Sequence, residues 1–120
     1  MSESSPRISV AALKQAIEGR DAEALLRLYA DDAKMVIIDR QHPPSAPLEI
    51  DGRAAIGAYW HDVCGRAMTH RIEAGLADDT HLAFTESCAY PDGTRVFCSA
   101  MLDIAGGRIT RQVTLQEWDG

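Results

Sequence analysis

The spacing of apolar residues changes near residue 69, from a helical repeat to alternation along the chain. Four segments after that point alternate apolar and polar residues as half-buried strands do: residues 69–76, 81–90, 95–104 and 108–118. Turn residues separate them, namely Asp78-Asp79, Pro91-Asp92-Gly93 and Gly106-Gly107. The second half of the chain therefore predicts consecutive hairpins in one antiparallel sheet.

Helices dominate the first half of the chain. Ser9 can cap a first helix that Gly19 closes, and Asp21 can cap a second helix that runs to about residue 30. A third helix is predicted over about residues 53–66. Two short strands precede it, residues 35–39 and 48–52, joined by a proline-rich loop. This order predicts an α+β fold in which a curved sheet of about six strands wraps around three N-terminal helices.

Size and charge restrict the organisation of the chain and its partners. With 120 residues, 46% of them hydrophobic, the chain can form one domain, which we expect at residues 8–120 after a disordered segment, residues 1–7. The net charge of -6 comes from dispersed acids and disfavours nucleic acid or a membrane surface as partner. No segment reads as a signal peptide or as a membrane span, so a cytoplasmic protein is expected.

The run from Leu25 to Trp60 carries the strongest family signal. A helix ends in YADDA, a strand and a proline-rich loop follow, and DGRAAIGAYW opens the next helix. This order resembles the nuclear transport factor 2-like superfamily, in its polyketide cyclase and ketosteroid isomerase (SnoaL-like) branch, over roughly residues 8 to 118. The resemblance implies a cone-shaped domain with a pocket for a small, mainly apolar organic ligand. It also implies a homodimer formed through the convex face of the sheet.

Strand alternation and the resemblance together predict the pocket lining. On the last strand, Gln112, Gln116 and Trp118 share the inward face, whereas Val113 and Leu115 face outward. The predicted ligand-binding residues are Tyr29, Trp60, Tyr90, Gln112, Gln116 and Trp118. Packing in the core is the alternative for the four aromatic residues, and surface exposure is the alternative for the two glutamines.

Asp39 is the candidate general base. A carboxylate at the end of a buried apolar strand would be partly desolvated, which suits proton abstraction. The alternative is that Asp39 caps a turn in the loop before His42. Counted from Tyr29, the base position of the isomerases corresponds to Ile37 here. Their oxyanion-binding positions correspond to residues without a suitable donor, Leu13 and either Cys98 or Leu102, which argues against a steroid isomerase mechanism.

His70 is the second catalytic candidate, because it begins a strand near the expected pocket rim and can titrate near neutral pH. A solvated histidine at a strand end is the alternative. Glu86 shares its parity with apolar neighbours, but a bulge or the opposite parity would place it outside, and we favour that interpretation.

Neither a cofactor nor a metal is predicted. The four histidines lack metal-ligand spacing, and the three cysteines show no C-x-x-C pattern. We expect the cysteines to be small buried apolar residues rather than nucleophiles.

Two function classes stay open. The first is proton transfer next to a carbonyl, giving isomerisation or aldol-type cyclisation, with Asp39 as base and His70, Gln112 or Gln116 polarising the oxygen. The second is a non-catalytic ligand-binding or dimeric assembly domain. The sequence does not decide whether the protein is an enzyme, and it does not identify the ligand or the pathway.

Overall fold

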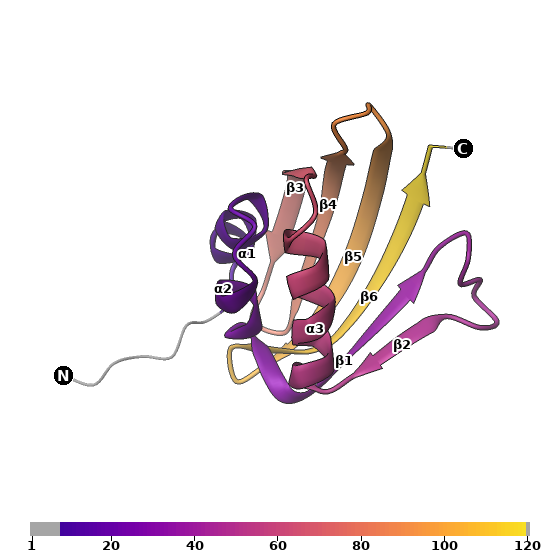
Figure 1. Ribbon diagram of the computed structural model, residues 1–120. Coiled ribbons are helices and arrows are strands. Elements are labelled where there is room, and N and C mark those ends of the chain that lie inside the picture. Colours follow the sequence, from indigo (N-terminus) through magenta and orange to yellow (C-terminus); the bar gives the residue numbers. More distant parts are fainter. Residues whose placement is uncertain (1–7, 120) are drawn as a thin grey trace.

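The computed structural model describes residues 8–119 and shows three helices packed on one face of a curved six-stranded sheet (Figure 1). The predicted disordered segment, residues 1–7, lies outside the described residues. In chain order the elements are α1 (Val10–Glu18), α2 (Ala22–Leu26), β1 (Tyr29–Ile38), β2 (Leu48–Asp51), α3 (Arg53–Cys64), β3 (Thr69–Ala77), β4 (His81–Ala89), β5 (Arg95–Ala105) and β6 (Arg108–Trp118). The predicted α+β fold is confirmed. None of the described helices is long and apolar enough to cross a membrane.

The strands follow the order β2-β1-β6-β5-β4-β3. Strands β3 to β6 form the three predicted hairpins, and every neighbouring pair is antiparallel except β1 with β6. A parallel pair needs a long connection between its strands, and here all of the elements from β2 to β5 lie between β1 and β6 in the chain.

The two predicted helix caps are confirmed. Ser9 Oγ accepts the N–H of Ala12 at 3.0 Å, and Asp21 Oδ1 accepts the N–H of Ala24 at 3.0 Å. The predicted extent of the second helix, to about residue 30, is wrong, because α2 ends at Leu26. Beyond α2 the backbone pairs with β6 instead of continuing the helix. The Leu28 carbonyl accepts the N–H of Ile109, so it does not accept a helical hydrogen bond.

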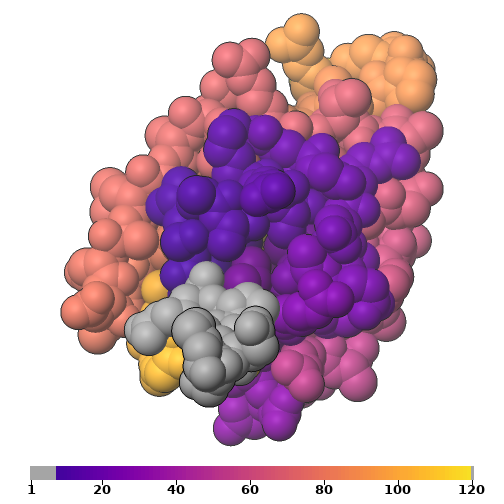
Figure 2. Space-filling view, turned by 90° about the vertical axis from the view of Figure 1, so that its left-hand side faces the viewer, coloured from indigo at the N-terminus to yellow at the C-terminus, as the bar shows by residue number. Residues whose placement is uncertain are grey.

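The core fills the space between the helices and the concave face of the sheet. Inward residues alternate along β5 as expected, with Val96, Cys98, Ala100 and Leu102 buried. Helices α1 and α2 cover one part of this face (Figure 2). Gly75 of β3 permits the close approach of α1, since a Cβ at this position would lie only 2.8 Å from Val10 Cγ1. The far ends of β4, β5 and β6 extend beyond α3 (Figure 1), so the sheet continues past its helical cover at that end.

Candidate functional site

A cavity of about 600 Å³ lies between the concave face and α3. Its wall is mainly apolar and includes Met35, Ile37, Trp60, Val63, Met68 and Phe84. Polar side chains interrupt this wall on the loop after β1, on β3, β4 and β6, and in the segments that follow α3 and β6. A mostly apolar cavity with few polar groups is the usual form of a site for a small organic molecule.

Six of the eight predicted site residues line this cavity: Asp39, Trp60, His70, Gln112, Gln116 and Trp118. The other two lie behind the lining and hold lining residues in place. The Tyr29 hydroxyl donates to Gln112 Oε1 at 2.6 Å and accepts from Trp60 Nε1 at 3.0 Å. Tyr90 stacks on Trp118, with ring centroids 5.8 Å apart. Burial raises the pKa of Tyr29, so its hydroxyl stays protonated as this arrangement requires.

The two glutamines are tied into the protein by their amide groups. Gln112 Nε2 donates to Thr114 Oγ1 at 3.0 Å, and Gln116 Nε2 donates to the Tyr59 hydroxyl at 3.1 Å. Gln112 is only 3% exposed, so surface exposure does not hold for this residue. Their fixed orientation makes the glutamines suited to shaping the pocket wall.

Asp39 lies one residue beyond β1, where the cavity meets the following loop. Its Oδ1 accepts the backbone N–H groups of Gln41 and His42 at 3.0 and 2.8 Å, and it lies 2.9 Å from His42 Nδ1. Asp39 therefore caps a turn and also lines the cavity, so both interpretations of the sequence describe part of its environment.

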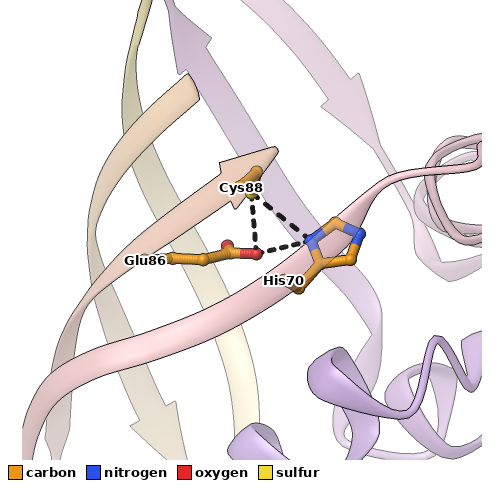
Figure 3. Close-up of side chains that lie close together, drawn as sticks. All are labelled: His70, Glu86 and Cys88. Atoms are coloured by element: carbon orange, nitrogen blue, oxygen red, sulfur yellow. Dashed lines mark hydrogen bonds and ion pairs between the residues drawn. The ribbon is translucent and has the colours of Figure 1, made fainter. Parts of the chain in front are cut away.

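His70, Glu86 and Cys88 form a buried cluster on β3 and β4 (Figure 3). His70 Nδ1 lies 2.6 Å from Glu86 Oε2, and the Cys88 thiol donates to the same oxygen at 3.1 Å. Glu86 is 5% exposed, so the interpretation that placed it outside is wrong. Burial alternates along β4 without a break, and the irregularity of this hairpin lies in β3, between Ile72 and Ala74. The inward parity of Glu86 is therefore kept.

Charge is distributed unevenly within this cluster. Burial opposes the charge of His70, but the contacts with Cys88 and with the Glu86 carboxylate outweigh it and raise the pKa of His70 to about 9. A hydrogen bond with Cys98 and burial raise the pKa of Cys88. Near neutral pH the imidazole of His70 is thus cationic and the thiol of Cys88 is neutral, so the thiol is not primed as a nucleophile.

The same three side chains are the candidate metal ligands among residues 8–119, with donor atoms within 4.8 Å of one another. The 2.6 Å between His70 Nδ1 and Glu86 Oε2 is a hydrogen-bond distance. Two such ligands of one tetrahedral zinc ion would be roughly 3.3 Å apart, given metal–ligand bonds of about 2.0–2.1 Å. The cluster has the geometry of a hydrogen-bonded group rather than that of a prepared metal site.

Arg66 and Tyr59 also line the cavity, although neither was predicted from the sequence as a site residue. Arg66 follows α3 and donates to the Tyr90 hydroxyl at 3.0 Å. Its position in a connecting segment gives no periodic signal, so its direction depends on the folded chain. For Glu86 a signal existed, namely its shared parity with Phe84 and Cys88.

Comparisons with known proteins agree with this architecture. The chain matches the SnoaL-like domain family over residues 10–112. No curated protein matches the chain. An NTF2-like protein of unknown function from Burkholderia xenovorans has a TM-score of 0.73 and 18% identity, covering 90% of this chain and 79% of that one. An NTF2-like protein of unknown function from Mesorhizobium loti has a TM-score of 0.71 and 18% identity, covering 90% and 85%. A loop truncation variant of IdmH has a TM-score of 0.67 and 22% identity, covering 89% and 88%.

Proposed function

This chain belongs to the SnoaL-like domain family, and from that premise we propose that it binds a small, mainly apolar organic molecule and catalyses proton transfer next to a carbonyl group. Isomerisation of a double bond and aldol-type cyclisation both begin with this step. Asp39 acts as the base, and His70 faces the developing charge on oxygen.

One observation carries this proposal: the cavity is lined by acid–base groups from two distant parts of the sheet. Asp39 follows β1, whereas His70 belongs to β3, and strands β6, β5 and β4 lie between them. The strand register brings both residues to the same end of the sheet. On the side of Asp39, Ile38 pairs with Leu115, three residues before Trp118 at the end of β6. From there Trp118 pairs with Val96, Val96 with Cys88, and Cys88 with His70. A ligand spanning the cavity would meet a carboxylate on one side and a cationic imidazole on the other.

Enolisation uses these two kinds of group. Removal of a proton next to a carbonyl transfers negative charge to the oxygen, so the reaction needs a base at carbon and a donor at oxygen. The apolar part of the wall lowers the local dielectric constant, which strengthens both interactions. The glutamines, held by Tyr29 and Tyr59, would orient the ligand without exchanging protons.

A non-catalytic ligand-binding domain is the second candidate, and the hydrogen bonds of Asp39 favour it. Two backbone N–H groups and the His42 ring converge on Asp39 Oδ1, as expected for a carboxylate that only stabilises the loop. The two candidate functions predict different results when Asp39 is replaced by an uncharged residue.

Hydrogen exchange distinguishes them. We expect the protein to accelerate the replacement of the α-protons of 2-tetralone by deuterium in D₂O, followed by NMR. Asp39→Asn should lower this rate by a factor of about a hundred to ten thousand, because the base is removed. Asp51→Asn is the matched control, since Asp51 is an exposed carboxylate on β2 that does not line the cavity. Exchange at the buffer rate would support the binding domain instead, whereas accelerated exchange that Asp39→Asn leaves unchanged would contradict the role of Asp39 as base.

A further inference from the structure

Three side chains with metal-binding atoms converge in the sheet (Figure 3). His70 belongs to β3, and Glu86 and Cys88 belong to β4, where Cys88 is the direct partner of His70 in register. Their donor atoms lie within 4.8 Å of one another. Imidazole, carboxylate and thiolate are the side-chain groups that bind zinc in proteins. The cluster therefore supplies three ligands of the right chemical kind from two paired strands.

The protonated cluster leaves one polar atom unsatisfied. The cationic imidazole of His70 has an N–H at both nitrogens, but Nε2 is buried and has no hydrogen-bond partner among residues 8–119. An unpaired buried group costs more free energy when it is charged. A metal ion in place of the proton on Nδ1 would leave the imidazole neutral, with its one proton on Nε2. The exchange therefore lowers the cost of this unpaired N–H.

The charges of the three ligands match those of a divalent ion. One carboxylate and one thiolate balance its two positive charges, and the neutral imidazole adds none. The metal-bound cluster would then have no net charge, which matters because the side chains of His70 and Glu86 are only 3% and 6% exposed and Cys88 is 6% exposed.

The short distances within the cluster are those of shared protons. His70 Nδ1 lies 2.6 Å from Glu86 Oε2, and Cys88 Sγ lies 3.1 Å from that oxygen and 3.4 Å from Nδ1. Around one tetrahedral zinc ion the nitrogen and oxygen would be roughly 3.3 Å apart, and the sulfur roughly 3.6 Å from each. Each pair therefore has to separate by less than about 1 Å when a metal replaces the protons. Small side-chain rotations supply this while β3 and β4 stay paired.

We propose that His70, Glu86 and Cys88 bind zinc or a similar divalent metal ion, which displaces the protons of Nδ1 and of the thiol. The two protons pass to solvent, and Nδ1, a Glu86 oxygen and Cys88 Sγ become ligands, with water in the fourth position. Because binding releases protons, the affinity should rise with pH. This site goes beyond the proposed function, which uses the protonated form of His70, so the two forms of the cluster exclude each other.

Co²⁺ is a suitable probe, because it occupies zinc sites and its complexes absorb light. Titration of the reduced protein at mildly alkaline pH should produce the visible bands of a tetrahedral ion and a thiolate-to-cobalt charge-transfer band in the near ultraviolet. Both should saturate at one ion per chain, and Zn²⁺ should remove them, because it binds such sites more tightly than Co²⁺ does. Absence of the charge-transfer band would overturn the proposal.

Cys88→Ser is the test variant, and Cys64→Ser is its matched control. Cys64 is also buried, and it lines a separate surface hollow with His61, where a metal could meet another sulfur. The charge-transfer band should vanish in Cys88→Ser and persist in Cys64→Ser. The reverse result would place the metal at Cys64 and overturn the inference. The exposed pair of His81 and Asp78 contains no sulfur, so an ion bound there cannot produce the band.

A measurement on the unaltered protein covers the case in which Cys88→Ser does not fold. In a ¹⁵N-labelled sample, addition of Zn²⁺ should shift the Nδ1 resonance of His70 more than any other imidazole nitrogen. A larger shift at His42, His61 or His81 would overturn the proposal.

Discussion

At the scale of single residues, the ion pair of His70 and Glu86 gives the protein a specific dependence on pH. The environment of His70 raises the pKa of its imidazole from 6.5 to about 9. The folded protein therefore binds the imidazole proton more tightly than the unfolded chain does. The stabilisation is complete below pH 6.5 and is lost as the pH rises through about 9. We therefore expect the free energy of unfolding, measured with urea and circular dichroism, to fall between these two pH values.

Glu86→Gln is the matching variant for that measurement. It leaves a buried imidazole without its counter-ion, so it should destabilise the protein by about 3 kcal/mol near pH 6. It should also make the slope between pH 6.5 and 9 shallower, because Cys88 and Glu86 both raise the pKa of His70 and the variant removes the contribution of Glu86. An unchanged slope would show that another group causes the pH dependence.

At the scale of elements, one buried hydroxyl joins a helix to two strands. Tyr29 of β1 connects Trp60 of α3 to Gln112 of β6 through its oxygen. Tyr29→Phe keeps the ring but deprives two buried polar groups of this partner, so it should lower the free energy of unfolding by about 2 kcal/mol. Urea titration checks this value.

Tyr59→Phe is the comparison for Tyr29→Phe. The Tyr59 hydroxyl accepts one hydrogen bond, from the half-buried Gln116, so its loss should cost less than the loss of the Tyr29 hydroxyl. If the two variants lost the same free energy of unfolding, the two hydrogen bonds of the Tyr29 hydroxyl would stabilise the protein no more than the single hydrogen bond of the Tyr59 hydroxyl.

At the scale of the whole molecule, the convex face of the sheet presents apolar side chains in a continuous row. Leu76, Ala83, Met101 and Val113 are neighbours in register across β3 to β6. Leu76 and Met101 are 73% and 53% exposed, and Leu115 on β6 is 56% exposed. Because monomeric proteins rarely expose large apolar patches, we predict a homodimer formed through this face.

Light scattering tests the assembly. The unaltered protein should show about twice the chain mass of 13.1 kDa, and Val113→Glu should shift it towards the single-chain mass. Ala58→Glu, on the exposed side of α3, adds the same charge away from the sheet and should leave the mass unchanged. A mass of one chain for the unaltered protein at micromolar concentration would refute the prediction.

The sequence by itself determined the features that depend on neighbours along the chain. Alternation specified the strands β3 to β6 and the inward faces wherever their pairing is regular, because successive side chains of a strand point to opposite sides. The caps at Ser9 and Asp21 were equally local, since each joins residues three apart. The cavity-lining residues Gln112, Gln116 and Trp118 followed from this parity together with the family resemblance, and Trp60, on a helix, followed from the resemblance alone.

Only the tertiary structure decided the features that join distant segments. The backbone at Leu28 pairs with Ile109, which ended α2 early and made Tyr29 the first residue of a strand. The irregularity of the β3–β4 hairpin lies in β3, which left Glu86 inward and placed it against His70. These outcomes depend on free energies of pairing and burial between residues 16 to 81 positions apart, and no local pattern contains them.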